Sequence, residues 1–202
     1  MSYQGKAAYM GNVANVTQRK RADKERELLI TELTATKEEL RFQATHDGLT
    51  GLWNRTAVLD QLERIVAQGA REKRPLTVGM ADLDHFKAIN DRYGHPSGDA
   101  VLTETALRLR SQLRPADMIA RMGGEEFLIF CPHTDVDGAF SLAEKLRSNI
   151  EKTEFEGAGY KTASLGVTHV EHGDTLQSMI HRADKALYSA KHSGKNMVVA
   201  AK

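Results

Sequence analysis

Cysteine is almost absent from this chain of 202 residues, which contains only Cys131. A single cysteine excludes a disulfide within the chain and is typical of a protein from a reducing compartment. Because Cys131 ends the apolar run 128–131, we expect a small buried hydrophobic side chain and not a nucleophile.

An excess of charge of either sign is also missing. Lys and Arg number 28 and Asp and Glu number 27, which gives a formal net charge of +1. Without a basic surplus, the composition does not point to a nucleic-acid partner. No apolar run approaches the length of a membrane span and no leader peptide is recognisable, so we expect a cytoplasmic chain without a membrane segment. A longer parent protein could still carry membrane segments.

The first 45 residues differ in character from the remainder. Residues 11–17 alternate like a strand, and residues 18–27 form a charged run. Residues 18–44 predict one helix with a weak heptad, which is typical either of a parallel dimeric coiled coil or of an amphipathic helix on its own domain. The apolar positions of that heptad are Ile30, Leu33, Leu40 and Ala44, and Lys37 interrupts them.

The remaining residues alternate between helical and strand-like patterns, and the length is enough for one sizeable core plus an extension. Such a pattern predicts an α/β sandwich in which helices cover a largely antiparallel sheet. We expect helices over 55–70, 99–113, 137–151 and 175–192, and strands near 76–82, 118–121, 126–131 and 162–170.

Residues 121–127 read Arg-Met-Gly-Gly-Glu-Glu-Phe and lie between two apolar runs. Because glycine reaches positive φ at little cost, Gly123 and Gly124 predict a tight hairpin turn. Glu125 and Glu126 follow at once, so the turn would present carboxylates beside exposed backbone N–H groups. That arrangement suits a metal and a phosphate held together, although such a segment taken alone is more often a solvated turn.

A second acidic segment favours a metal and phosphate site over a solvated turn. Asp82 follows the short apolar run 76–80, which predicts a buried strand, and Asp84 lies two positions further along. Open α/β sheets place ligands at strand ends, and a carboxylate there is costly unless it is paired or bound to metal. Asp82 alone is more often a cap or a surface ion pair. Together with the glycine turn, it favours a magnesium site, since Mg²⁺ takes one or two carboxylates and completes its shell with phosphate and water.

Several motifs in one order make the chain similar to the GGDEF domains, the diguanylate cyclases, in their GGEEF variant. One five-residue motif arises easily by chance, but the whole set in this order does not. Residues 16–22 are in addition similar to the exit from a PAS sensor domain, where a last strand runs into a helix. The motifs of the main resemblance are residues 46–55, 82–87 continuing to 99, 121–127, 164–167 and 183–191.

The resemblance implies three segments in the chain. Residues 1–17 would be the remnant of an upstream PAS-like domain, residues 18–45 a signalling helix or coiled-coil linker, and residues 46–202 the GGDEF catalytic domain. The implied fold is α/β, with a central, mainly antiparallel sheet flanked by helices and preceded by a long helix. It is related to the palm of nucleotide cyclases and polymerases.

The activity that the resemblance implies is the condensation of two GTP into cyclic di-GMP with release of two pyrophosphates. Because one domain binds one GTP, the site forms only between two domains of a homodimer, and this favours the coiled-coil interpretation of residues 18–44. Two Mg²⁺ ions, or Mn²⁺, would assist at a separation of about 3.5–4 Å. Asp82, Glu125 and the Leu83 carbonyl would bind metal, and Glu126 would help to deprotonate the attacking hydroxyl.

The substrate contacts carry over in the same way. Asn90 and Asp99 would bind the guanine edge, although Asp99 could instead cap the following helix. Lys191 and Lys195 would hold the β- and γ-phosphates from one helical face, provided that the helix continues past Gly194. The family usually has arginine where Lys195 stands, and lysine lacks the bidentate fork. Lys87 is a further phosphate candidate, whereas Asp84, His85, Phe86 and His95 are expected to be structural.

Arg114 and Asp117 match the family's RxxD product-inhibition site in sequence and in their spacing from Gly123. An arginine can stack on guanine or donate two parallel hydrogen bonds to it, and an aspartate accepts from the guanine N–H groups. The slot of a third basic residue falls on Lys145, with Arg147 close by. The alternative is an ordinary ion pair at a helix end, which contributes little at a surface.

Two functions of different class are compatible with these residues. The favoured one is an active cyclase with product inhibition, because the acidic cluster, the glycine turn and both guanine contacts are present. The other is a binding module with little catalytic activity, which senses cyclic di-GMP at the RxxD site or GTP at the former active site.

Overall fold

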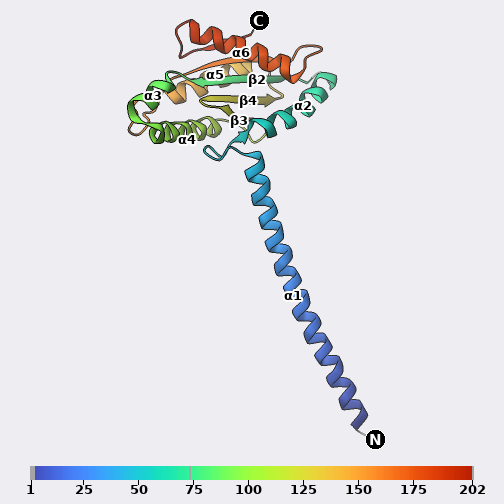
Figure 1. The fold of residues 1–202 in the computed structure, drawn as a ribbon. Coiled ribbons are helices and arrows are strands. Elements are labelled where there is room, and N and C mark those ends of the chain that lie inside the picture. The colour runs from blue at the N-terminus through green and yellow to red at the C-terminus, as the bar shows by residue number, and fades with distance from the viewer. Residues whose placement is uncertain (1–2, 73, 202) are drawn as a thin grey trace. The chain divides into compact units, whose positions relative to one another are not determined.

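The computed structural model of this chain describes residues 3–72 and 74–201, and the chain divides into two compact units between residues 44 and 45. Helix α1, Tyr3–Thr45, forms the first unit except for its last residue, Thr45, which belongs to the second (Figure 1). The helix predicted over 18–44 is confirmed, and its apolar positions are exposed, Leu33 by 70% and Leu40 by 60%. None of the described helices is both long and apolar enough to cross a membrane.

The strand expected over residues 11–17 is wrong, because the backbone there is helical. A strand needs a neighbouring strand to bond its N–H and C=O groups, whereas a helix bonds them within its own segment. Alternation over seven residues is therefore a weak signal where no partner strand is available.

The second unit is built on one six-stranded sheet with the strand order β1-β3-β4-β2-β5-β6. The four inner strands pair antiparallel, while the short edge strands β1 and β6 pair parallel with β3 and β5. The expected mainly antiparallel sheet is therefore confirmed. The strands are β1 Trp53–Asn54, β2 Leu76–Leu83, β3 Met118–Gly123, β4 Glu126–Pro132, β5 Ala163–His169 and β6 Val198–Ala200.

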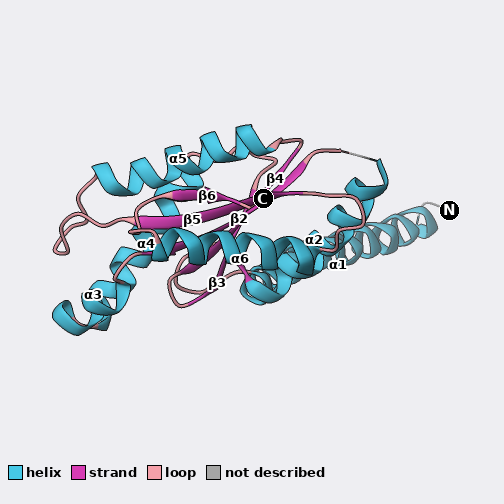
Figure 2. Ribbon diagram, turned by 90° about the horizontal axis from the view of Figure 1, so that it is seen from above, coloured by secondary structure: helices cyan, strands magenta, loops and turns pink. Residues whose placement is uncertain are grey.

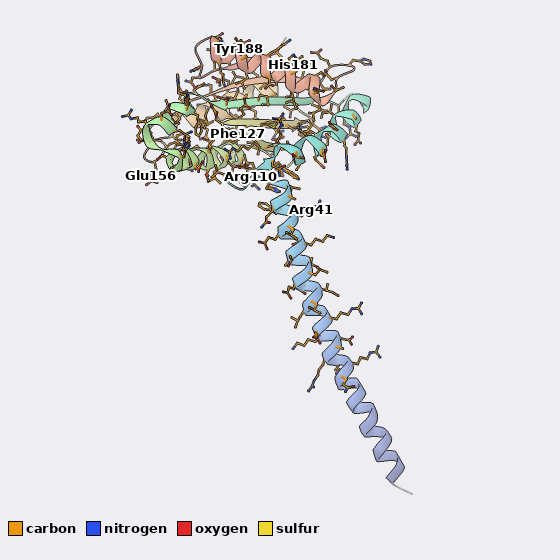
Figure 3. All side chains as sticks on the ribbon, viewed as in Figure 1. Arg41, Arg110, Phe127, Glu156, His181 and Tyr188 are labelled. Carbon is orange, nitrogen blue, oxygen red and sulfur yellow. The ribbon has the colours of Figure 1, made fainter. Side chains whose placement is uncertain are left out.

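Helices cover both faces of the sheet, and the buried side chains form two clusters accordingly (Figures 1 and 2). Helices α3, α4 and α5 contribute to one cluster, and α2 and α6 contribute to the other. Phe127 lies inside the domain, whereas Tyr188 lies on the outer side of α6 (Figure 3). The helices are α2 Arg55–Glu72, α3 Phe86–Tyr93, α4 His95–Ser111, α5 Val136–Lys152 and α6 Leu176–His192.

The central strand β2 explains how a carboxylate comes to lie in the interior. All of its residues are buried, because it pairs on both sides and has helices over both faces. On the neighbouring strand β5, Gly166 allows α6 to approach closely, since a Cβ there would collide with the backbone of Ala183 and Leu187. Helix α6 is thereby held against the sheet, and its C-terminal end lies near the end of β2.

The main departures from the expected elements occur between residues 86 and 99. Helix α3 was not predicted, and α4 begins at His95, four residues before the expected start. Asp99 therefore lies inside α4 and is not its N-cap, a position that Gly94 occupies. The edge strands β1 and β6 were not predicted either, because two or three residues carry no detectable alternation.

Candidate active site

The glycine turn forms as predicted and places two glutamates beside the end of β2. Gly123 and Gly124 have φ values of 148° and 54°, which glycine adopts readily. Strands β3 and β4 pair on either side of the turn, with an irregular register next to Gly123. Across the sheet, Asp82 is the register partner of Glu126. The two acidic segments that lie 43 positions apart in the sequence are therefore neighbours in space.

Two charged residues that the sequence analysis did not select hold this turn in place. The Arg121 Nε donates to the Gly124 carbonyl at 2.9 Å, and its Nη1 forms an ion pair with Asp47 at 3.2 Å. Asp47 also accepts hydrogen bonds from the backbone and the hydroxyl of Thr50. Burial alone would raise the pKa of Asp47, but these bonds from Thr50 and Arg121 outweigh it and lower the pKa. The opening motif of the domain thus anchors the glycine hairpin.

Asp82 is a buried carboxylate with only 4% of its surface exposed. Burial raises its pKa to about 6, the charge and hydrogen bond of Lys191 oppose this, and the charges of Glu125 and Glu126 add to it. The Lys191 Nζ lies 2.6 Å from the Asp82 Oδ2. The charges of Glu125 and Glu126 thus act on Asp82 at the end of β2, and Lys191 partly neutralises Asp82.

The donor set of this cluster fits a hard divalent cation. Among the described residues, no three His, Cys, Asp or Glu side chains are arranged to hold a metal by themselves. Mg²⁺ does not need three, because it takes one or two carboxylates and fills its octahedral shell with phosphate oxygens and water. The raised pKa of Asp82 indicates a carboxylate that lacks sufficient positive charge, which is the condition that a cation relieves.

The two residues expected to bind guanine approach each other around Gly98. Asn90 is half-buried on α3, and Asp99 is exposed on the second turn of α4. A Cβ at Gly98 would collide with the Asn90 side-chain amide, so glycine is needed where that amide packs against α4. Gly98 directly precedes Asp99, and the amide and the carboxylate are therefore presented by adjoining segments.

The three lysines expected to bind phosphate have different surroundings. Helix α6 ends at His192, and Lys195 has φ 65°, so Lys191 and Lys195 do not share a helical face. Lys191 instead pairs with Asp82, and the Lys195 Nζ lies 3.2–3.3 Å from the ring nitrogens of His85. Lys87 is exposed on the first turn of α3, and the structure shows no contact between its ammonium group and the other site residues that it describes.

Arg114 and Asp117 form a closed turn between α4 and β3, and they are not an ion pair on a helix. The Asp117 carboxylate accepts from the Arg114 backbone N–H at 2.9 Å, and the Asp117 N–H donates to the Arg114 carbonyl at 3.0 Å. The guanidinium of Arg114 is left exposed. Cys131 is buried as expected, and burial, with the Asp117 charge next in effect, raises the pKa of its thiol to about 12.

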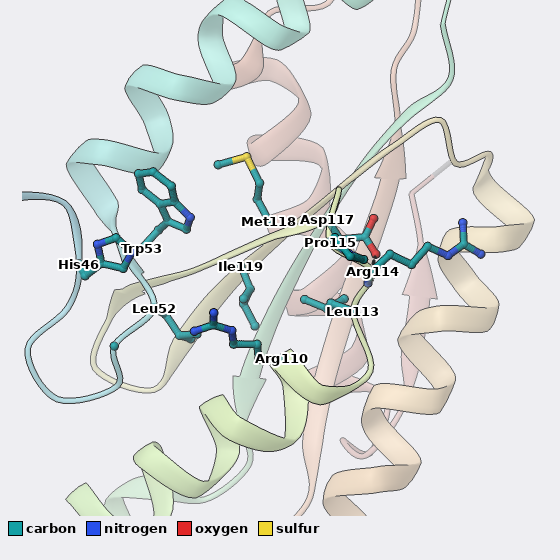
Figure 4. A pocket seen from close by; sticks show the side chains of 11 residues that line it. His46, Leu52, Trp53, Arg110, Leu113, Arg114, Pro115, Asp117, Met118 and Ile119 are labelled. Carbon is teal, nitrogen blue, oxygen red and sulfur yellow. Dashed lines mark hydrogen bonds between the residues drawn. The ribbon is translucent and has the colours of Figure 1, made fainter. Parts of the chain in front are cut away.

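A cavity of about 330 Å³ adjoins this turn on the side of residues 46–53. Arg110 and the stacked rings of His46 and Trp53 contribute to its wall. Arg114 also lines this cavity, and Figure 4 shows its side chain extending away from those of Arg110 and His46.

The third basic residue of the proposed inhibitory site was left open between Lys145 and Arg147. Arg147 forms ion pairs with Glu144 and Glu151 on its own helix, at 2.9 and 2.7 Å. Lys145 is exposed on the same helix. The partners of Arg147 therefore favour Lys145 for that role.

The six-stranded sheet thus brings a glycine turn and a buried strand-end aspartate together. The family model described as "Diguanylate cyclase, GGDEF domain" matches residues 44–197. The chain therefore belongs to the GGDEF domain family of diguanylate cyclases.

The relatives extend well beyond the length of this chain. Diguanylate cyclase DgcM of Escherichia coli is 40% identical over 172 residues, which cover 85% of this chain and 42% of DgcM. Diguanylate cyclase DgcP of Pseudomonas aeruginosa is 43% identical over 162 residues, which cover 79% of this chain and 24% of DgcP. The chain thus spans less than half of the length of these curated relatives.

A solved structure has the same arrangement of elements. The coiled coil and GGDEF domain of DgcB from Caulobacter crescentus, in complex with c-di-GMP, matches with a TM-score of 0.83 at 32% identity. The match covers 91% of this chain and 98% of that chain. It includes a helical segment before the domain, as this chain has in α1.

Proposed function

We propose that this chain is a diguanylate cyclase that condenses two GTP into cyclic di-GMP and two pyrophosphates. The observation that carries the proposal is the buried Asp82 paired in register with Glu126 beside the Gly123-Gly124 turn. A buried carboxylate at a strand end is costly to fold unless a cation neutralises it, which supports a metal-binding role for Asp82. The membership of the family and the named relatives support the same activity.

Each 3′-hydroxyl attacks the α-phosphate of the opposite GTP, its proton is removed, and pyrophosphate leaves. Glu126 is exposed beside Asp82 and is the group we assign to accept that proton. Asp82, Glu125 and the Leu83 carbonyl would hold Mg²⁺, or Mn²⁺, at two positions. When bound, the metal supplies a Lewis acid that stabilises negative charge on the phosphates.

The remaining residues bind and orient the nucleotide. The Asn90 amide can donate to and accept from the guanine edge, and the Asp99 carboxylate accepts from it. A carboxylate there favours guanine because adenine lacks the paired N1–H and amino donors. Lys191 and Lys195 neutralise the β- and γ-phosphates, with Lys87 as a further cation. Lys191 therefore exchanges its bond to Asp82 for one to phosphate when GTP and metal bind. Positioning and charge neutralisation are the main sources of rate in phosphoryl transfer.

We assign the working unit as a homodimer, because two bound nucleotides must face each other. The exposed apolar positions of α1 support a parallel coiled coil that would bury them. Residues 18–45 would then act as a signalling helix between the cytoplasmic catalytic domain, residues 46–202, and an upstream PAS-like sensor of which residues 1–17 are the remnant.

We assign Arg114 and Asp117 to a second site that binds the product cyclic di-GMP and inhibits turnover. The support is the exposed guanidinium beside a carboxylate that its own turn holds in place. Lys145 on α5 is the third basic residue that we assign to this site.

The test is incubation of the purified chain with GTP and Mg²⁺ over a series of protein concentrations. Cyclic di-GMP and pyrophosphate are quantified by chromatography. Product formation that rises faster than linearly with protein is expected, since the site needs two chains. No product at any concentration, together with tight binding of added cyclic di-GMP, would instead favour the binding module.

A further inference from the structure

A second buried carboxylate lies two residues beyond Asp82 and takes no part in the proposed chemistry. Asp84 is 4% exposed, and its carboxylate accepts from the hydroxyls of Thr162 and Ser164 at 2.7 Å each. It also accepts from the backbone N–H of Asn196 at 3.0 Å. Asp84 therefore joins the end of β2 to the start of β5 and to the loop between α6 and β6.

That loop has an unusual backbone. Gly194, Lys195 and Asn196 have φ values of 122°, 65° and 48°, so three successive residues have positive φ. Lysine disfavours this region, and a non-glycine residue keeps a positive φ only where its surroundings fix it. The contacts of Asn196 are suited to fix it.

The side chain of Asn196 is held from the opposite side by α5. The Arg147 Nη1 donates to the Asn196 Oδ1 at 2.7 Å, and the Asn196 Nδ2 donates to the Glu151 Oε1 at 2.8 Å. Arg147 also pairs with Glu151 at 2.7 Å, which closes a ring of three side chains. Asn196 is thus bonded through its backbone to Asp84 and through its side chain to two residues of α5.

The residue that this arrangement places is Lys195. It lies between Gly194 and Asn196, and its Nζ lies 3.2–3.3 Å from the ring nitrogens of His85. His85 is itself in the left-handed region, with φ 59°, directly after Asp84. The same buried carboxylate therefore adjoins both segments that bring Lys195 and His85 together.

We propose that Asn196 is a positioning residue that ties the loop of Lys195 to Asp84 and to α5, and so sets the affinity for the terminal phosphates of GTP. This inference rests on the proposed GTP site, but not on turnover. A lysine cannot form the bidentate hydrogen bonds of an arginine. Its ammonium group therefore contributes most to phosphate affinity when its position is fixed before the ligand binds.

The test compares the binding of GTP and GMP to the Asn196→Gly variant of the 202-residue chain and to the wild-type chain by calorimetry. Ca²⁺ replaces Mg²⁺ so that turnover does not interfere. Glycine keeps the backbone N–H and tolerates positive φ, so only the two side-chain bonds are lost. We expect GTP to bind about fivefold to tenfold more weakly, as expected for one or two lost hydrogen bonds, with GMP nearly unchanged. With Mg²⁺, the KM for GTP should rise while kcat stays within about twofold of wild type.

Two further variants separate positioning from general stability. Arg147→Met removes one of the two partners of Asn196 on α5 and should lower the GTP-to-GMP affinity ratio in the same direction. Glu144→Gln weakens the other contact of Arg147, at its Nε, and should leave that ratio unchanged. Thermal unfolding of all three identifies any variant whose fold is disturbed.

An equal loss of GTP and GMP affinity in Asn196→Gly, or no loss in a folded variant, would overturn the inference. If wild type binds GTP no more tightly than GMP, the inference also fails. If wild type makes no cyclic di-GMP but Asn196→Gly lowers the GTP-to-GMP ratio, the cyclase proposal fails and the positioning role of Asn196 stands.

Discussion

The Asp82–Lys191 pair and the Arg114–Asp117 pair each join an acid to a base, but they are held differently. Lys191 contacts Asp82 directly across the domain, and Asp82 is buried with a pKa raised to about 6. Asp117 instead accepts from the backbone of Arg114, which leaves the guanidinium exposed. The first pair contains a buried carboxylate whose charge Lys191 neutralises only in part, and a bound cation would complete the neutralisation. The second pair presents the Arg114 guanidinium at the surface. Substitutions at the two places should therefore have opposite consequences for product yield.

Glu126→Gln should have the largest effect. Removal of the group that accepts the hydroxyl proton should lower kcat by roughly 10²–10⁴-fold, while the exposed position leaves the fold intact. Steady-state formation of cyclic di-GMP measures this, and calorimetry should show unchanged binding of cyclic di-GMP at the Arg114 turn. Glu156→Gln, an exposed glutamate elsewhere, is the matched control. Turnover of Glu126→Gln near the wild-type value would remove Glu126 from the mechanism.

Arg114→Ala should raise the yield of product. A hydrogen bond from a charged group to guanine or phosphate contributes about 1.5–3 kcal/mol, so the inhibition constant for cyclic di-GMP should rise about 10- to 100-fold. Inhibition curves with added cyclic di-GMP measure it. Arg64→Ala is the control, because Arg64 is an exposed arginine on α2 that does not line the cavity beside Arg114. Equal inhibition of Arg114→Ala and wild type would mean that the turn is only structural.

Asp82→Asn should stabilise the fold at pH 7 when EDTA removes divalent ions. The pKa of Asp82 rises from 3.8 unfolded to about 6 folded, so the charged form opposes folding by about 1–3 kcal/mol. Lys191, which is one-third exposed, can be hydrated in the variant. Urea unfolding at pH 7 measures the difference. A less stable variant would mean that the ion pair outweighs the cost of burial.

The pH dependence of the free energy of unfolding is the smallest of the expected effects, and it tests the Asp82–Lys191 pair most directly. Between pH 4 and 6 the folded protein binds more protons at Asp82 than the unfolded chain does. This group should therefore lower wild-type stability as pH rises through that window, and the effect should be complete above about pH 6. Asp82→Asn should lack this component when unfolding curves of both proteins are compared from pH 4 to 7. Parallel curves would exclude a raised pKa for Asp82.

Local patterns were sufficient for much of this protein. The buried run before Asp82 predicted β2, and Gly123-Gly124 predicted the hairpin, because each depends on residues adjacent in the sequence. The amphipathic periodicity likewise predicted α2, α5 and α6 to within about two residues at their ends. The identity of the acidic cluster followed from motif order, and the structure adds the register of Asp82 with Glu126.

The errors and omissions have one physical origin. Glycine at position 98 disfavours a helix, so periodicity alone places the start of α4 after it. In the structure α4 begins before Gly98, and the Asn90 amide packs so closely there that glycine is required. The pairing of Lys191 with Asp82, and the contact of Lys195 with His85, join segments about 110 positions apart. Side-chain geometry at that separation depends on how helices pack against the sheet, and no local pattern encodes it.

The amino-acid order was enough for the family, the elements and the chemical identity of the groups at the site, since these depend on residue type and spacing. Tertiary packing determined that Lys191 neutralises Asp82 and that Lys195 lies in a loop after α6. It also determined how Asn196 links Asp84 to α5. Those outcomes depend on burial, which raises the cost of an unpaired charge, and on contacts that exist only once α5 and α6 lie against the sheet.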